Sequence, residues 1–165
     1  MQITKEFKFE MAHKLSKSYT CKCQHIHGHS YRVLITLKGY RLNDENVVID
    51  FTKVKEVVKP IIELLDHSFM IHKDDKVCDE LIDAAKRGGF SIIVAKKNPT
   101  AEFLAGLFYG ELYSHFFHKE DKLLLEVEVF ETATSSAKVS AITDKIVVAA
   151  SRLEELEIIP AKDVK

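Results

Sequence analysis

Three histidines near the N-terminus have the residue type and the spacing of metal ligands. His27 and His29 open a segment in which apolar residues alternate with mostly polar ones, the pattern of a strand with one buried face. Successive side chains of a strand point to opposite faces, so both imidazoles share the face that carries Val33, roughly 7 Å apart. Two neutral imidazoles placed in this way can converge on one cation.

His13 supplies a third ligand. Residues 2–13 show a similar alternation, and His13 continues their apolar face. If the segments 2–13 and 27–38 form an antiparallel hairpin, the loop 14–26 brings His13 beside the other two imidazoles. Three imidazoles and an open fourth position are typical of a catalytic zinc site. The alternative is three ordinary half-buried histidines, but buried rings need polar partners and one metal satisfies all three.

Four further residues could take part in chemistry. Cys23 lies close in sequence to the expected metal, which would stabilise its thiolate. Asp66 precedes His67 where an apolar helical stripe stops, and a carboxylate can orient a neighbouring imidazole and raise its pKa, as in a proton relay. Glu131 continues the apolar face of a strand, where the adjacent N–H donors of a pterin or guanine would pair with it. A small buried cysteine, a surface Asp–His pair and a solvated glutamate are the open alternatives.

These residues must be positioned by a small set of strands and helices. Beyond the hairpin, periodicity and end signals predict a helix capped by Thr52 and ending at Asp66, a second major helix beginning at 98–100, strands over 123–131 and 137–142, and a helical tail over 144–156. Pro60 inside the first helix predicts a kink or a split.

The segment between the two major helices is the hardest to interpret. A short helix is predicted over 77–87, ending at two glycines, and a short apolar run follows over 90–94. We interpret residues 70–97 as an insertion and the chain from about residue 144 as a C-terminal extension. Because no internal repeat or linker is visible, residues 1–165 are expected to form a single domain.

Composition limits the classes of partner. The chain has 165 residues, of which 46% are hydrophobic, and its net charge of -1 gives no basic field for nucleic acid. No apolar run approaches the roughly 20 residues of a membrane span, and strand alternation begins at once in place of a signal peptide. The three cysteines do not have the spacing of a disulfide framework. We therefore expect a cytoplasmic protein with a small-molecule partner.

With these residues in place, the sequence resembles the 6-pyruvoyl-tetrahydropterin synthase and 6-carboxy-tetrahydropterin synthase family. The motifs that carry the resemblance, in family order, are Phe9-Glu10-Met11-Ala12-His13, Cys23-x-x-x-His27-Gly28-His29, Val48-Ile49-Asp50-Phe51, Leu65-Asp66-His67, Asn98-Pro99-Thr100-Ala101-Glu102 and Glu131-Thr132. The resemblance implies an α+β tunnelling fold of ββααββ subunits, with an antiparallel sheet and two helices on one face. It also implies barrel-like trimers that pair as hexamers, with active sites at subunit interfaces.

The resemblance also implies roles for individual residues. The family's zinc ligands fall on His13, His27 and His29, its catalytic cysteine on Cys23, its Asp–His relay on Asp66 and His67, its pterin-anchoring glutamate on Glu131, and its pterin-contacting threonine on Thr100. The expected cofactor is therefore Zn²⁺, and the expected partner is a pterin triphosphate substrate, with no nucleic acid and no membrane.

The gap of three residues between Cys23 and His27 resembles the carboxy-tetrahydropterin synthases of the queuosine pathway. The implied reaction converts 7,8-dihydroneopterin triphosphate to 6-carboxy-5,6,7,8-tetrahydropterin, acetaldehyde and triphosphate. The alternatives are pyruvoyl-tetrahydropterin synthesis, aldolase-like cleavage, and a non-catalytic zinc- or pterin-binding protein on the same scaffold. The insertion, the extension and the additional thiol of Cys21 depart from compact members of the family.

Overall fold

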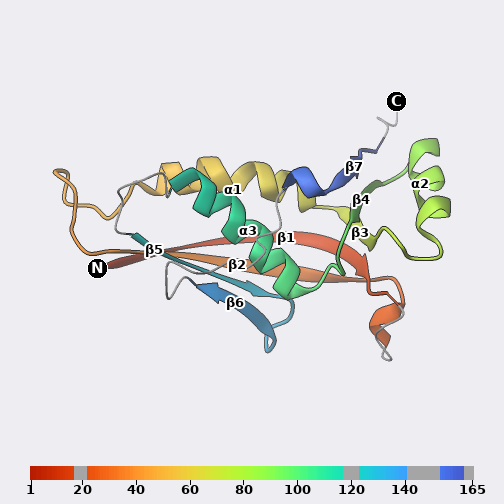
Figure 1. The fold of residues 1–165 in the computed structure, drawn as a ribbon, viewed down its shortest axis with the longest axis horizontal. Coiled ribbons are helices and arrows are strands. Elements are labelled where there is room, and N and C mark those ends of the chain that lie inside the picture. The colour runs from red at the N-terminus through yellow and green to blue at the C-terminus, as the bar shows by residue number, and fades with distance from the viewer. Residues whose placement is uncertain (17–21, 117–122, 141–152, 162–165) are drawn as a thin grey trace.

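The centre of the molecule is a long antiparallel hairpin of two strands, β1 (Gln2–Lys14) and β2 (His27–Gly39) (Figure 1). The register pairs His13 with His27 and Met11 with His29. The computed structural model describes residues 1–16, 22–116, 123–140 and 153–161. The predicted hairpin and its face are confirmed, because Tyr31, Val33 and Ile35 of β2 are all buried.

Within the described ranges, the hairpin lies inside a seven-stranded sheet with the order β6-β5-β2-β1-β3-β4-β7. The other strands are β3 (Ser68–His72), β4 (Ser91–Ala95), β5 (Leu123–Phe130), β6 (Ser136–Ser140) and β7 (Glu157–Ile159). Strands β5 and β6 agree with the predicted strands over the residues described. The α+β fold class is confirmed, but the sheet is mixed and not wholly antiparallel, because β3 runs parallel to β1 and β4 parallel to β3.

In the part of the chain that the structure describes, three helices cover the sheet, and they are the two major helices and the short one that we expected. The helices α1 (Phe51–Leu65) and α3 (Ala101–Phe116) pack with the main core, which includes Met70 and Ile93 from β3 and β4. The helix α2 (Cys78–Arg87) packs with a second core that contains Ile71 and Ile92 from the same strands. Because side chains alternate along a strand, α2 covers the opposite face of β3 and β4 from α1 and α3. Within the described ranges, no helix is long and apolar enough to cross a membrane.

The first helix differs from its prediction at its N-terminus. Asp50, and not Thr52, is the N-cap: its carboxylate accepts a hydrogen bond from the Thr52 backbone N–H at 2.7 Å. The helix continues through Pro60 as one element, so of the two predicted effects the split is wrong, and the kink stays a prediction. Pro60 is exposed, where the backbone carbonyl that lost its N–H partner can reach water.

The segment interpreted as an insertion forms a strand–helix–strand unit that widens the sheet. The predicted helix over 77–87 is confirmed as α2, and the apolar run over 90–94 is β4. The strand β3 was not predicted, because its centre is buried on both faces and shows no alternation. In the predicted tail, residues 141–152 lie outside the described part, and residues 153–155 form a short 3-10 turn before β7, which was also not predicted. Cys21 lies outside the described residues as well.

Candidate metal centre

The three predicted metal ligands meet at one end of the hairpin. His13 ends the apolar face of β1, and His27 and His29 begin β2 on the same face. Their ligand nitrogens all lie within 4.8 Å of one another, and the Nε2 atoms of His13 and His27 are 2.9 Å apart. His13 is only 1% exposed, whereas His27 and His29 are half-buried, so the cluster has a buried side and a side that faces outward. This geometry brings together the three histidines that spacing had selected.

Backbone carbonyl oxygens orient two of the three imidazole rings through hydrogen bonds at their Nδ1 atoms. The Nδ1 of His13 lies 2.6 Å from the Pro99 carbonyl oxygen, and the Nδ1 of His27 lies 2.7 Å from the His25 carbonyl oxygen. A carbonyl only accepts, so each Nδ1 carries the proton and each Nε2 presents a lone pair. Two lone pairs would then face each other across 2.9 Å unless a cation lies between them. The donor set therefore fits a metal ion.

Burial keeps the His13 and His29 imidazoles in their metal-binding form. Desolvation lowers the pKa of His13 to about 4, against the raising effect of the Pro99 hydrogen bond, and His27 and His29 lower it further. Burial also lowers the pKa of His29, opposed in part by the Glu131 carboxylate. Neutral imidazole is the form that binds a metal, so these two rings need no deprotonation at neutral pH.

Glu131 reaches the cluster from β5, on the other side of β2. It follows Phe130, the last residue of β5, and its Oε1 atom lies 3.5 Å from the His13 Nε2 and 3.7 Å from the His29 Nε2. The alternation of β5 correctly placed this carboxylate on the buried face, and Val127 and Val129 on that face are fully buried. The sequence analysis predicted a partner for Glu131 but did not anticipate that the imidazoles of His13 and His29 would lie next to its carboxylate.

Tyr31 is a residue at this site that the sequence interpretation missed. Its side chain is 1% exposed, and its hydroxyl lies 3.3 Å from the Nδ1 of His13. The ring stacks on Phe9 with centroids 5.0 Å apart, which fixes the phenol behind the imidazole. Its place two residues after His29 on the same strand face was the available signal.

The predicted relay lies on the other side of β1, next to β3. The Asp66 Oδ2 is 2.9 Å from the His67 Nδ1, and the Asp66 Oδ1 accepts a hydrogen bond from the Glu10 N–H at 2.8 Å. The Glu10 N–H, together with His67, lowers the pKa of Asp66 in spite of slight desolvation. His67 has a left-handed backbone (φ 57°), which residues other than glycine rarely adopt, and its side chain is 80% exposed. Asp66 and His67 therefore form a pair, and neither belongs to the imidazole cluster.

Cys23 and Thr100 are connected to the segments of the cluster through backbone hydrogen bonds of their own or of a neighbouring residue. Cys23 is half-buried in the 3-10 turn Lys22–Gln24, and its carbonyl accepts a hydrogen bond from the N–H of Leu15, two residues after His13. It is not one of the clustered ligands. Thr100 follows Pro99, and its hydroxyl accepts a hydrogen bond from the Phe103 N–H at 3.3 Å, so its side chain caps α3.

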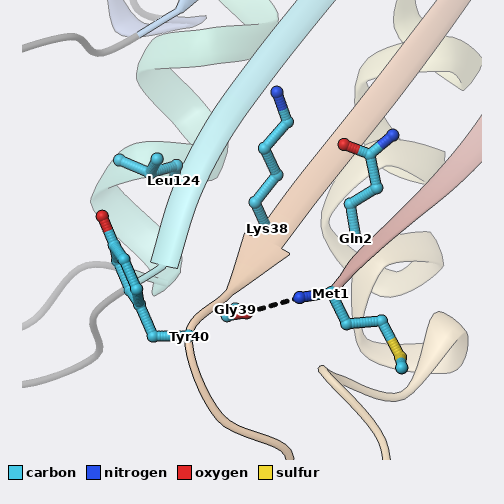
Figure 2. A pocket seen from close by; sticks show the side chains of 6 residues that line it. All are labelled: Met1, Gln2, Lys38, Gly39, Tyr40 and Leu124. Carbon is cyan, nitrogen blue, oxygen red and sulfur yellow. Dashed lines mark hydrogen bonds between the residues drawn. The ribbon is translucent and has the colours of Figure 1, made fainter.

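A hollow at the other end of the hairpin has no part in this site. Figure 2 shows the residues that line it, Met1, Gln2, Lys38, Gly39, Tyr40 and Leu124. Gln2 pairs with Lys38 eleven residues along β1 from His13, which is roughly 35 Å at the rise of a strand. In the figure the N-terminal ammonium donates to the Gly39 carbonyl, a contact that closes the sheet end.

Solved structures with the same fold define the class of protein. The chain aligns with an uncharacterised protein from Wolinella succinogenes at a TM-score of 0.66 and 25% identity, covering 84% of this chain and 97% of the other. It aligns with the 6-pyruvoyl tetrahydropterin synthase of Plasmodium falciparum at a TM-score of 0.65 and 22% identity, covering 86% of this chain and 97% of the other. The α+β sheet with its helices is thus the tunnelling fold.

Sequence comparison places the chain within that class. Residues 2–141 match the 6-pyruvoyl tetrahydropterin synthase family, and the chain belongs to that family. It is 36% identical over 157 residues to the 6-carboxy-5,6,7,8-tetrahydropterin synthase of Aquifex aeolicus, covering 83% of this chain and 96% of the relative. It is 29% identical over 133 residues to the enzyme of the same name from Rickettsia bellii, covering 80% and 94%.

Proposed function

We propose that the protein is a zinc-dependent 6-carboxy-5,6,7,8-tetrahydropterin synthase of queuosine biosynthesis. It would convert 7,8-dihydroneopterin triphosphate and one water to the 6-carboxy product, acetaldehyde and triphosphate, in the cytoplasm. The side-chain carbon that becomes the carboxyl group is oxidised while the dihydropterin ring is reduced to the tetrahydro level. The observation that carries the proposal is the similarity to the Aquifex aeolicus relative of that name along 96% of its length. The short gap between Cys23 and His27, which resembles that branch of the family, supports the same assignment.

Zinc is the metal that suits this donor set. Three neutral imidazoles, two of them oriented by backbone carbonyls, are typical of catalytic zinc sites with a fourth position for substrate or water. Bound by His13, His27 and His29, Zn²⁺ would act as a Lewis acid toward the side-chain oxygens of the substrate.

The remaining roles belong to side chains of the protein. The Cys23 thiolate moves protons on the side-chain carbons of the substrate, and His67, oriented by Asp66, supplies or accepts a proton on the opposite face. Glu131 accepts the adjacent N–H donors of the pterin ring and fixes its orientation, and Thr100 contacts the same ring.

The position of the relay favours an oligomer. His67 is 80% exposed on the β3 side of β1, whereas the imidazoles lie between β1 and β2. An exposed pair of this kind can meet the site of a second copy, and we propose trimers or hexamers with active sites at the subunit interfaces. Light scattering on a size-exclusion column measures the mass, and a monomer at every concentration would contradict this part of the proposal.

The product distinguishes the proposed enzyme from its sister. We would incubate the zinc-loaded protein with 7,8-dihydroneopterin triphosphate and measure acetaldehyde and the mass of the pterin product. Acetaldehyde with a 6-carboxy product is the expected result. A pyruvoyl product without acetaldehyde would assign the chain to the other activity of the family, and unchanged substrate would favour a binding protein.

Two variants test the residue roles in the same assay. Cys23→Ala should retain zinc and lose turnover. Cys78→Ala, which alters a buried cysteine at the start of α2, serves as the matched control and should keep turnover. His27→Ala should lose stoichiometric zinc. Full turnover in Cys23→Ala would remove the thiolate from the proposal, and full zinc content in His27→Ala would refute the metal assignment.

A further inference from the structure

The carboxylate of Glu131 lies where a fourth metal ligand would lie. Its Oε1 atom is 3.5 Å from the His13 Nε2 and 3.7 Å from the His29 Nε2. A tetrahedral zinc with ligands at about 2.0–2.1 Å has ligand atoms about 3.3–3.4 Å apart. The two distances from the Glu131 Oε1 are therefore close to the ligand-to-ligand distance of a tetrahedral zinc site. The 2.9 Å between the Nε2 atoms of His13 and His27 is also close to that distance.

The distance from the Glu131 carboxylate to the His27 imidazole is the one that must decrease before both can bind the same metal ion. Glu131 is not among the atoms that all lie within 4.8 Å of one another, so its carboxylate must move toward His27 to complete the tetrahedron. The residue can move in this way because it lies just beyond the end of β5, with its backbone N–H bonded to the Ser135 carbonyl in the turn and its side chain 28% exposed. Rotations of a glutamate side chain are sufficient for a shift of this size.

Charge favours the same arrangement. The imidazoles are neutral ligands, so a bound Zn²⁺ keeps its full charge of two unless an anion joins it. Glu131 is the carboxylate that forms the ion-pair contacts with these histidines among the described residues. A carboxylate next to a partly buried dication gains more from direct binding than from solvent, because the local dielectric constant is lower than that of water.

We infer that Glu131 closes the metal site as its fourth ligand when no substrate is present, and that the pterin substrate displaces it. This inference rests on the proposed metal site. The same carboxylate cannot bind the metal and accept both N–H donors of the ring in one conformation, so substrate binding moves Glu131 from the metal to the ring. The fourth position then opens only when the ring has been recognised, which keeps other small anions away from the metal of the resting protein.

The test uses the Co²⁺-substituted protein and azide, a small anion that binds open metal positions. Visible absorption of Co²⁺ reports its coordination directly and requires no turnover. If Glu131 occupies the fourth position nine times in ten, the apparent azide dissociation constant of the wild type is about tenfold higher than that of Glu131→Ala. The spectrum of the substrate-free wild type should also stay constant between about pH 6 and pH 9, whereas Glu131→Ala should show the titration of a bound water with a pKa near 7.

A matched control and a second variant complete the design. Glu128→Gln alters a glutamate of β5 on the opposite face, where it contacts Ser136 and Lys138, and should behave as the wild type. Glu131→Gln keeps the shape of the side chain and should resemble Glu131→Ala, which protects the test against misfolding of the alanine variant. Equal azide affinity and equal spectra in the wild type and both Glu131 variants would overturn the inference. Failure of the wild type to bind Co²⁺ at all would instead refute the metal site and with it the proposed function.

Discussion

Removing the metal should leave a protein whose stability falls steeply in mild acid, because of His13. The folded state lowers the pKa of this buried imidazole from 6.5 to about 4. As the pH falls, the unfolded chain takes up the proton first, so stability is lost between about pH 6.5 and pH 4 and is unaffected at higher pH, where both states are neutral. Linkage with these two values gives a loss of about 0.2 kcal/mol at pH 7 and about 2 kcal/mol at pH 5.

The measurement is urea unfolding of the chelator-treated protein at pH 7, 6 and 5, at one fixed protein concentration. His13→Gln is the matched variant, because glutamine can still donate to the Pro99 carbonyl but does not titrate. Between pH 7 and pH 5 the wild type should lose about 2 kcal/mol more than His13→Gln, since other titrating groups contribute to both. Equal losses in the two proteins would refute the claim that His13 is held neutral by burial.

Three more predictions follow from the same structure. Ile93→Ala, at a fully buried position of β4, should lower the free energy of unfolding by about 2–5 kcal/mol. Ile158→Ala, at a position of β7 that is 43% exposed, should change it by less than about 0.5 kcal/mol. Equal effects of the two substitutions would mean that β4 is not part of the core. Asp66→Ala should lower kcat by about 10²–10⁴-fold with zinc content unchanged, because His67 loses its orienting partner; unchanged kcat would exclude the relay. Zinc at about 100 times its dissociation constant should raise the free energy of unfolding by about 2.7 kcal/mol, measured by thermal or urea unfolding. Equal stability of the zinc-loaded and the chelator-treated protein would contradict a structural contribution of the metal.

The parts of the fold that the sequence predicted correctly are those in which one face of a strand or helix is buried and the opposite face is exposed to solvent. Strands β1, β2 and β5 alternate for this reason. Their alternation was sufficient to bring His13, His27 and His29 together and to place Glu131 on the buried face of its strand. Strand β3 is buried on both faces, so Phe69-Met70-Ile71 reads as a short apolar run without a period. The edge strand β7 is only three residues long, too short for any periodic signal.

The site was less predictable where backbone groups supply the contacts. The carbonyls of Pro99 and His25 orient the imidazoles, and any residue type carries a carbonyl, so no side-chain pattern indicates them. The separation of Asp66 and His67 from the cluster depends on β3 pairing with β1, which sequence interpretation had not found. The capping error at Thr52 has a similar origin, because Asp50 and Thr52 are both good caps and the tertiary context selects between them.

The hydrogen bond between His13 and the Pro99 carbonyl also sets the order of events during synthesis. The two residues are 86 positions apart, so the His13 imidazole lacks its carbonyl partner until strand β4 and the start of α3 have left the ribosome. At about 5–20 residues per second, the hairpin with all three histidines exists for several seconds before that carbonyl arrives. A nascent chain therefore carries a ligand set in which His13 is not yet held by its carbonyl, so it binds metal more weakly than the folded domain does.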